Sequence, residues 1–403
     1  MDNERIGRWR KHEIRSRSAD SLVTAYGKIG PPGFRTAKTG GPNCDNIFVM
    51  SPAPDRKLPS VIALLITAIP LSAQRAVVHE KDIVKAIIDQ FDRSDLVGLG
   101  ELHGSQADQN LRFQVIHSKA FARKVRIIAV EGLNAFYQED LDRYIRGEDV
   151  PLEQVQKVWR DSTGIFVGPV IRTTYQQFLS EVRSVNRGLP DRMKLRVIAA
   201  DPPLDWTKVQ STADFRAILS KRVVFGVDVI EREALQKGQK ALLVFAGSWF
   251  TRNMQHRTAN GLVPWTETIG AGLDRDYPGR LYVIAPVRSG EYPDSAKLEG
   301  LIGTPRSPVL LRLHGTPFGA LDANEFLPAN PAALLGSPAS PFHTYRDGTT
   351  LSDVADAVIY RGKVADSVVR PDTSDAADTA YAAELKRRAA FAGAPPPGAR
   401  GGR

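Results

Sequence analysis

The sequence predicts an α/β fold, with a mostly parallel central sheet, helices on both faces and a helical cap insertion. Three apolar runs, at 95–100, 126–130 and 195–200, have the length and composition of buried strands. Helical patterns with one apolar face separate them, as at 82–91 and 105–123. Buried strands that alternate with helices are typical of a parallel sheet covered on both sides.

Each of these three strands ends in a carboxylate. Glu101, Glu131 and Asp201 follow the apolar runs directly, and His103 comes two residues after the first acid. In open α/β sheets the ligand crevice lies at the carboxyl ends of the strands. We therefore expect the three acids and His103 to meet in one cleft.

Length and composition indicate an ordinary globular protein. The chain has 403 residues, of which 42% are hydrophobic and 25% are charged, enough for a sizeable core. The formal charge is +9, but residues 1–49 hold nine Lys and Arg against five Asp and Glu. The remainder has no dense basic run with interleaved aromatic residues, so we expect no nucleic-acid partner.

The amino-terminal part has the features of a leader. Residues 1–49 are rich in Arg, Ser, Gly and Pro without sustained periodicity, and they contain Cys44, the only cysteine. A basic pair, an apolar run at 61–69 and small residues up to Ala73 then form an export signal that begins at Met50. We expect residues 1–49 to be disordered and to result from an over-extended start, and residues 50–73 to be removed on export to the periplasm or the medium.

The remaining elements follow in order after the first strands. Three helices are expected at 135–146, 152–161 and 169–186, which is more than a simple crossover needs and indicates the cap. A helix at 222–237 precedes a fourth buried strand at 240–250 that ends in a glycine turn. Further strands are expected at 280–286 and 308–313, and a last ordered element at 353–360. The domain is thus expected to span 74–369, and the Ala-, Asp- and Pro-rich residues 370–403 to be a disordered tail.

Several short motifs resemble the superfamily of erythromycin esterases, ChaN-type haem-binding proteins and the TraB/Tiki group. They are Leu-Gly-Glu-Leu-His-Gly at 99–104, Val-Glu-Gly at 130–132, the tyrosine-containing segment 137–144 and the segment 353–360. The resemblance implies an α/β fold, a Gly-Glu-x-His loop at the active cleft and a second Glu from the next strand. One residue separates Glu101 from His103, as in the ChaN-like form, and Trp249 stands where many relatives have a histidine.

The residue types support two functions. In a hydrolase that cleaves an ester or lactone, His103 would activate water while Glu101 or Glu131 orients its ring. In a binder of haem or another large apolar ligand, Trp249, Arg252 and His256 would line the cleft. Three tyrosines on expected helices are candidate haem-iron ligands in that case: Tyr137, Tyr144 and Tyr175.

A divalent metal is a further alternative. Without cysteine in the folded part, its ligands would be His103 together with Glu101, Glu131 and Asp201. No segment after the leader is long and apolar enough to span a bilayer, so no stable membrane insertion of the mature protein is expected.

Overall fold

The computed structural model describes one of two units into which the chain divides. These units are Met1–Leu65 and Ile66–Arg403. The described residues all belong to the second: 76–164, 168–258, 261–264, 268–287, 295–303, 305, 307–326, 343–361, 367–372 and 378–392. The expected leader, including the export signal at 50–73, lies outside them.

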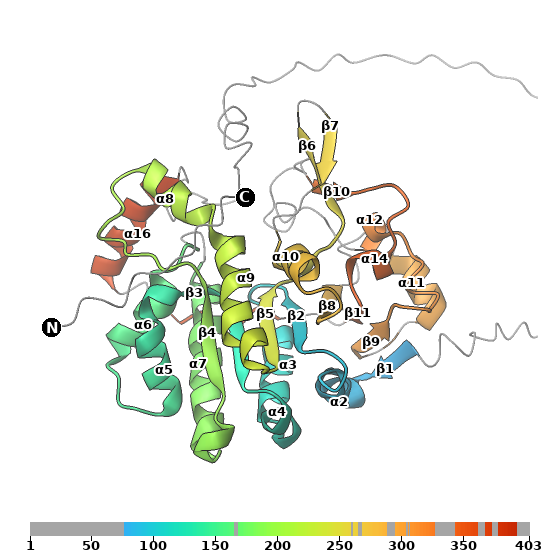
Figure 1. Ribbon diagram of the computed structural model, residues 1–403, viewed down its shortest axis with the longest axis horizontal. Helices are drawn as coiled ribbons and strands as arrows, with labels where there is room; N and C mark the ends of the chain where they lie inside the picture. The colour runs from blue at the N-terminus through green and yellow to red at the C-terminus, as the bar shows by residue number, and fades with distance from the viewer. Residues whose placement is uncertain are drawn as a thin grey trace, which may run out of the picture. The chain divides into compact units, whose positions relative to one another are not determined.

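An eight-stranded sheet forms the centre of the described unit (Figure 1). Its strands are β1 (Val77–His79), β2 (Leu96–Glu101), β3 (Ile127–Asn134), β4 (Arg196–Asp201), β5 (Ala241–Ala246), β8 (Leu281–Val287), β9 (Val309–Arg312) and β11 (Ala357–Tyr360). The order across the sheet is β1-β9-β11-β8-β2-β5-β3-β4. All pairs from β11 to β4 are parallel, whereas β9 runs antiparallel to both β11 and β1. The predicted mostly parallel sheet is confirmed.

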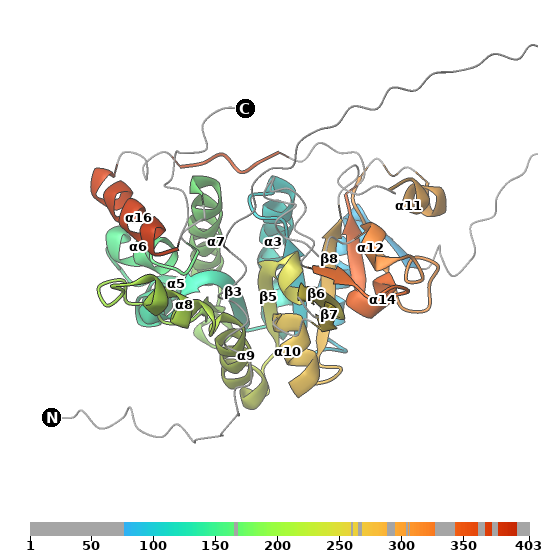
Figure 2. The same cartoon turned by 90° about the horizontal axis from the view of Figure 1, so that it is seen from above.

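Helices cover both faces of this sheet, as Figure 2 shows for α3 and α7 on one side and α9 and α10 on the other. The first face carries α2 (Glu80–Gln90), α3 (Gln106–His117), α4 (Lys119–Lys124), α5 (Gln138–Arg146), α6 (Leu152–Arg160) and α7 (Pro169–Arg187). The second carries α9 (Arg222–Glu233), α10 (Ile269–Asp276), α11 (Ser295–Ile302), α12 (Ala323–Phe326) and α14 (Leu351–Val354). Because both faces are covered, all residues of β2 and β3 are buried, which explains their nearly continuous apolar runs.

The three helices predicted between the second and third acidic strands are confirmed. They correspond to the short turn η2 (Ala135–Tyr137) with α5, to α6, and to α7, which has a proline in its first turn. All three pack against the sheet face that α3 also covers. The remaining short elements are η3 (Asp191–Met193), α8 (Thr212–Leu219), η4 (Leu235–Lys237) and η5 (Gly247–Phe250).

A second, small sheet has the order β10-β6-β7 and is antiparallel throughout. Its strands are β6 (Met254–Thr258), β7 (Gly261–Pro264) and β10 (His343–Tyr345). The sequence analysis places none of these strands. Within the described ranges, no helix has both the length and the apolarity needed to cross a bilayer.

The expectation of a disordered tail from residue 370 is wrong for residues 379–392. These residues form helix α16 (Thr379–Ala392), and three of its side chains, those of Tyr381, Arg388 and Ala389, are buried. The composition was misleading because the inner face of α16 is held by an aromatic ring and a paired arginine rather than by aliphatic residues.

Candidate active site

The topology creates a crevice at the carboxyl edge of the central sheet. Strands β2 and β3 lead into helices on one face, whereas their common neighbour β5 leads through η5 towards α10 on the other face. Where neighbouring strands send their connections to opposite faces, a crevice opens outside their carboxyl ends. Glu101 and Glu131 lie at this point.

The three strand-end acids are buried and linked through the sheet. Glu101 is paired in register with Ala246 at the end of β5, and the amide of Ala246 donates to Glu131 Oε2 at 2.7 Å. The amide of Gly132 donates to Asp201 Oδ1 at 3.2 Å. Each acid is at most 6% exposed. The structure thus brings the three predicted acids to one edge.

His103 is held by Glu101 on one side of this edge. Its Nδ1 lies 2.8 Å from Glu101 Oε1, and its side chain is 30% exposed. The other carboxylate oxygen of Glu101 forms an ion pair with Arg112 of α3. Burial lowers the pKa of Arg112 to about 10, which leaves the guanidinium charged at neutral pH. The buried charge of Glu101 is therefore compensated while its first oxygen orients the imidazole.

The inner face of α3 explains the position of Arg112. Asp108, Gln109 and Arg112 occupy the buried stripe of its first two turns, and Val115 and Ile116 continue it. The carboxamide oxygen of Gln109 accepts from Arg112, and Asp108 accepts from the amide of Leu102 at 2.7 Å. This helix therefore fixes the two residues directly before His103.

A second cluster surrounds Arg222, the first residue of α9. Its Nη2 donates to Glu131 Oε1 at 3.3 Å and to Asp201 Oδ1 at 3.1 Å. Burial by itself would lower the pKa of Arg222, but the negative charges of Asp201 and Glu131 outweigh this effect and raise it. The guanidinium carbon lies 4.8 Å from the centre of the Trp249 ring. Trp249 thus packs on the arginine that holds two of the acids.

Tyr175 of α7 lies between the two clusters. A Cβ at Gly132, where φ is +73°, would collide with the Tyr175 hydroxyl, so glycine is needed for both conformation and space. Burial raises the pKa of Tyr175 well above its usual value, and the charges of Glu131 and Asp201 add to this effect. The phenol therefore stays protonated, as a neutral group among the charges of the site.

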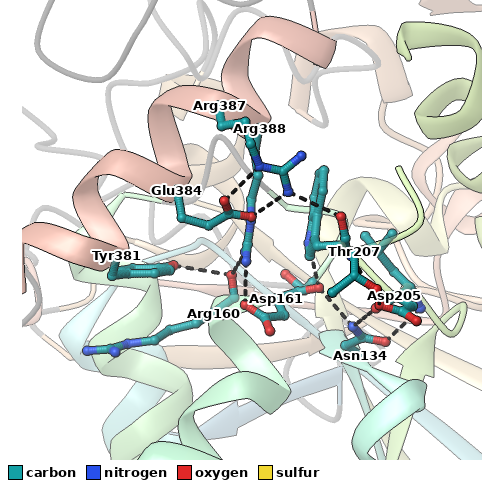
Figure 3. A network of polar contacts seen from close by, with 12 residues as sticks. Asn134, Arg160, Asp161, Asp205, Thr207, Tyr381, Glu384, Arg387 and Arg388 are labelled. Carbon is teal, nitrogen blue, oxygen red and sulfur yellow. Dashed lines mark hydrogen bonds and ion pairs between the residues drawn. The ribbon is translucent and has the colours of Figure 1, made fainter. Parts of the chain in front are cut away.

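The loop after α6 reaches the same edge and is fixed by the carboxyl-terminal helix (Figure 3). The Thr163 hydroxyl donates to Asp201 Oδ2. Two residues earlier, Asp161 accepts from Arg388 Nη2 at 2.8 Å and from the Tyr137 hydroxyl at 2.9 Å. Arg388 also donates to the carbonyl of Arg160 at 2.9 Å. Helix α16 is thus connected to Asp201 through the short loop at 161–163, which bonds to Arg388 at one end and to Asp201 at the other.

A second part of the carboxyl-terminal region lies against the His103 loop. Val369 donates its amide to the Gly104 carbonyl at 2.8 Å, and Gln106 donates its amide to the Ser367 carbonyl at 2.8 Å. Ser105 and Val368 form an antiparallel bridge between these bonds. The backbone directly after His103 is therefore fixed by residues more than 260 positions later in the sequence.

Arg252 is not part of this group of residues. Arg252 forms ion pairs with Asp274 and Asp356 and donates to the carbonyl of Leu281. Leu281 begins β8 and is paired with Leu96 at the start of β2, so Arg252 lies at the opposite, amino edge. The backbone of His256 belongs to β6 of the small sheet, and its side chain lies outside the described residues.

The described residues do not fit a metal ion. They contain no group of three or more His, Cys, Asp or Glu side chains that could hold one. Instead, the carboxylates of Glu131 and Asp201 accept hydrogen bonds from Arg222 and from backbone amides. Their charges are thus compensated within the protein.

The three tyrosines considered as haem ligands contact other residues of the protein or are buried. The Tyr137 hydroxyl donates to Asp161, Tyr144 lies under the guanidinium of Arg183, and the Tyr175 phenol is buried. Burial and the charge of Asp161 raise the pKa of Tyr137, and the pKa of Tyr175 is raised as well, whereas iron binds the deprotonated form. Among the described residues at this edge, the imidazole of His103 is the only remaining candidate ligand for iron.

The sequence analysis misses the partners that hold the acids. Arg112, Arg222 and Thr163 are polar residues on helices or loops outside the motif strands. One sequence feature points to Arg112, because Asp108, Gln109 and Arg112 share the spacing of the apolar positions Val115 and Ile116 that complete the inner stripe of α3.

Comparisons with known proteins concern the fold. No family model matches the sequence, and no curated protein matches it significantly. Among solved structures, a succinoglycan biosynthesis protein matches with 11% identity and a TM-score of 0.48, over 74% of this chain and 97% of that one.

Two further matching structures are those of an erythromycin esterase and a ChaN protein, the two kinds of protein that the sequence motifs resemble. An erythromycin esterase, the EreC mutant in its open conformation, has 12% identity and a TM-score of 0.46, over 70% of this chain and 94% of that one. The haem-binding ChaN of Campylobacter jejuni has 13% identity and a TM-score of 0.31, over 52% of this chain and 86% of that one.

Proposed function

We propose that the protein is a hydrolase that cleaves an ester- or lactone-type bond with a water molecule activated by His103. One observation carries the proposal: a partly exposed imidazole at the carboxyl edge of the sheet has its Nδ1 2.8 Å from a buried carboxylate. This pairing favours the tautomer with the proton on Nδ1, so Nε2 is the free acceptor. A base oriented in this way is the arrangement used for proton abstraction from a nucleophile.

The chemical step needs only groups present in the chain and water. His103 Nε2 takes a proton from water as the water oxygen bonds to the carbonyl carbon. The tetrahedral adduct then collapses, the bond to the leaving alkoxide breaks, and the imidazolium returns the proton to that alkoxide. Glu101 stabilises the imidazolium in between, and the ion pair with Arg112 holds the Glu101 side chain in place.

Ester hydrolysis by two histidine variants tests the proposal. His103→Ala removes the base and should lower kcat/KM for aryl esters or macrolactones by about 100-fold or more. His117→Ala is the matched control, since His117 belongs to the helix after the same loop but is paired with Glu181. Its kcat/KM should stay within about two-fold of wild type, because its partners lie outside the site. No turnover by the wild type, or equal loss in both variants, would show that the proposal is wrong.

The alternative is binding of haem or another large apolar ligand without catalysis. In a haem complex His103 would hold the iron through its partly exposed imidazole, which favours this reading over one with a tyrosine ligand. Haem titration decides it, because a Soret band that shifts in wild type and not in His103→Ala would support a binding role. Unchanged free-haem spectra at stoichiometric protein would exclude it.

A further inference from the structure

Tyr175 of α7 is a buried titratable residue at the carboxyl edge that the proposed mechanism does not use. Its ring packs in the hydrophobic core of the sheet face that α3 and α7 cover. Its hydroxyl is the part of the side chain that lies closest to Gly132, the residue after Glu131 in β3. The ring is thus held by the core, while the hydroxyl lies among the acids at the strand ends.

The Tyr175 hydroxyl forms no hydrogen bond with any residue that the structure describes. Two acids and two arginines of the site shift its pKa by their charges. The residue keeps 5% of its surface exposed, and its oxygen is not among the fully enclosed side-chain atoms without a partner in the described part of the chain, so this surface includes the oxygen. A nearly buried hydroxyl with an unused proton is rare in native proteins and indicates a function.

Other donors at this edge are already bound to acids. The guanidinium groups of Arg112 and Arg222 are paired with the strand-end carboxylates. The backbone amides of Gly132 and Ala246, at the ends of β3 and β5, donate to two of the same carboxylates. The phenol of Tyr175 differs from these groups because its proton is available to a ligand.

The phenol and His103 lie on two sides of the end of β5. His103 follows β2, the Tyr175 hydroxyl lies at the end of β3, and β5 is the strand between them. Neighbouring strands are about 4.8 Å apart, so the ends of β2 and β3 are separated by roughly 10 Å. Helices α3 and α7, which support the two groups, are joined by a hydrogen bond of 3.2 Å from Gln109 to the carbonyl of Thr174. An ester carbonyl and an attacking water molecule fit within this distance.

We propose that the Tyr175 hydroxyl donates a hydrogen bond to the oxyanion that forms when water attacks the ester carbonyl. The negative charge of the tetrahedral adduct resides on the former carbonyl oxygen, and a donor that is in place before the reaction stabilises this charge without reorganisation. The role rests on the proposed hydrolase function, to which it adds the group that binds the developing charge.

The surroundings of Tyr175 favour donation of a hydrogen bond over loss of the proton. Burial raises the pKa of Tyr175 well above its usual value, and the charges of Glu131 and Asp201 add to this effect. The phenol therefore stays neutral beside the oxyanion, whereas a phenolate would repel it. Proton transfer remains the task of His103.

Ester hydrolysis by two tyrosine variants tests this role. Tyr175→Phe keeps the ring and removes the donor, so kcat for aryl esters should fall about 100-fold while KM stays within about two-fold. Tyr282→Phe is the matched control, since burial also raises the pKa of Tyr282 but this residue pairs with Val97 near the amino edge. Its kcat should stay within about two-fold of wild type. Equal kcat in wild type and Tyr175→Phe would overturn the role.

Urea unfolding distinguishes a catalytic role from a packing role. Tyr175→Phe removes a hydroxyl without a hydrogen-bond partner, so the midpoint of unfolding should equal or exceed that of wild type. A lower kcat together with a lower midpoint would attribute the loss to packing and overturn the proposal.

Binding of a phosphonate gives a readout without turnover. An alkyl phosphonate monoester has a charged tetrahedral centre like that of the adduct, and it should bind Tyr175→Phe about ten-fold or more weakly than wild type. The planar, uncharged amide analogue of the ester should bind both proteins equally. A wild type that hydrolyses no ester and binds the phosphonate no more tightly than the amide would refute the hydrolase proposal and this role with it. Ester hydrolysis and phosphonate binding that are equal in wild type and Tyr175→Phe would refute the role of Tyr175 alone.

Discussion

At the scale of single residues, the candidate site depends on buried charges that compensate one another. Glu101 and Arg112 are both almost fully buried and form an ion pair. Removal of one partner leaves the other as an uncompensated buried charge, which costs more than the pair contributes. The position of His103 and the stability of the fold are therefore coupled through this pair.

A double-mutant cycle measures the coupling. Arg112→Met should lower the free energy of unfolding by about 3–5 kcal/mol, because Glu101 is left charged and buried. The double variant Glu101→Gln with Arg112→Met should recover part of this loss, since no buried charge remains. Urea unfolding followed by circular dichroism provides the measurement. Strictly additive losses would show that the two side chains do not interact.

The sequence predicts the acids and the histidine of the site but not most of the residues that hold them. Glu101, His103, Glu131 and Asp201 are visible because each follows an apolar strand, and strand ends meet at one edge by topology alone. Their partners Arg112 and Arg222 come from helices, and a polar residue on a helix is usually solvated. Arg112 shares the spacing of the buried positions of α3, whereas the inward position of Arg222 is visible only in the three-dimensional packing.

At the scale of elements, helices attach to the sheet through polar anchors as well as apolar faces. Glu233, the last residue of α9, accepts from Arg196 of β4 at 2.6 Å, and Arg196 also pairs with Asp142 of α5. One arginine at the start of β4 thus connects helices on the two faces of the sheet. Such a connection depends on pH because its acceptors must be ionised.

The pKa of Glu233 gives the direction of that dependence. Burial alone would raise it, but hydrogen bonds from Lys237, Arg196 and Arg232 outweigh this and lower it to about 2 from an ordinary 4.5. The ionised form therefore stabilises the folded state above pH 4.5, and this contribution is lost as the pH falls towards 2. Glu233→Gln should be less stable than wild type by about 1 kcal/mol at neutral pH, because Arg232 and Lys237 are half exposed and screened.

Urea unfolding at several pH values from 7 to 2.5 tests this prediction. The difference between Glu233→Gln and wild type should shrink steadily below pH 4.5. Glu153→Gln, at an exposed position in the first turn of α6, is the control and should differ from wild type by less than about 0.5 kcal/mol throughout. A constant difference for Glu233→Gln across the range would contradict the assignment.

Helix α16 is the element that the sequence analysis fails to predict. The segment is short of large aliphatic residues, so the apolar periodicity that reveals the other helices is weak. Its attachment relies on Arg388, which stacks on Trp206 at 4.8 Å and bonds to Asp161. Residues 370–403 are therefore not a disordered tail throughout. Composition alone does not distinguish a polar helix that packs against the domain from a disordered tail.

A buried arginine and an exposed lysine of α16 test this attachment. Arg388→Gln should speed amide hydrogen exchange in residues 379–392 and in the loop 161–164 by about ten-fold, because the buried bonds to that loop are lost. Lys386→Gln removes an exposed cation of the same helix and should change exchange by less than about two-fold. Equal exchange in both variants would show that Arg388 does not hold the helix in place.

At the scale of the whole molecule, the first described strand lies shortly after the expected export signal. β1 starts at Val77, four residues after Ala73, and pairs with Leu311 of β9 at the edge of the sheet. Cleavage after Ala73 would therefore leave every described strand intact. The segment before it combines Arg56 and Lys57 with the apolar run 61–69, which is the order of an export signal.

We propose on this basis that the protein is exported, and secretion of a chain that starts at Met50 tests it. The apolar run supplies the affinity for the export machinery and the small residues before Gln74 supply the cleavage point, so the exported product should begin close to Gln74. Replacing Leu64 and Leu65 by Asp puts two charges into the apolar run and should retain the full precursor in the cytoplasm, whereas Asp in place of Ser51, before the basic pair, should not. Amino-terminal sequencing and fractionation provide the readout. A wild-type chain that keeps its first residues and stays in the cytoplasm would rule out export by this segment, and it would leave the hydrolase proposal untouched because the site lies wholly within residues after 95.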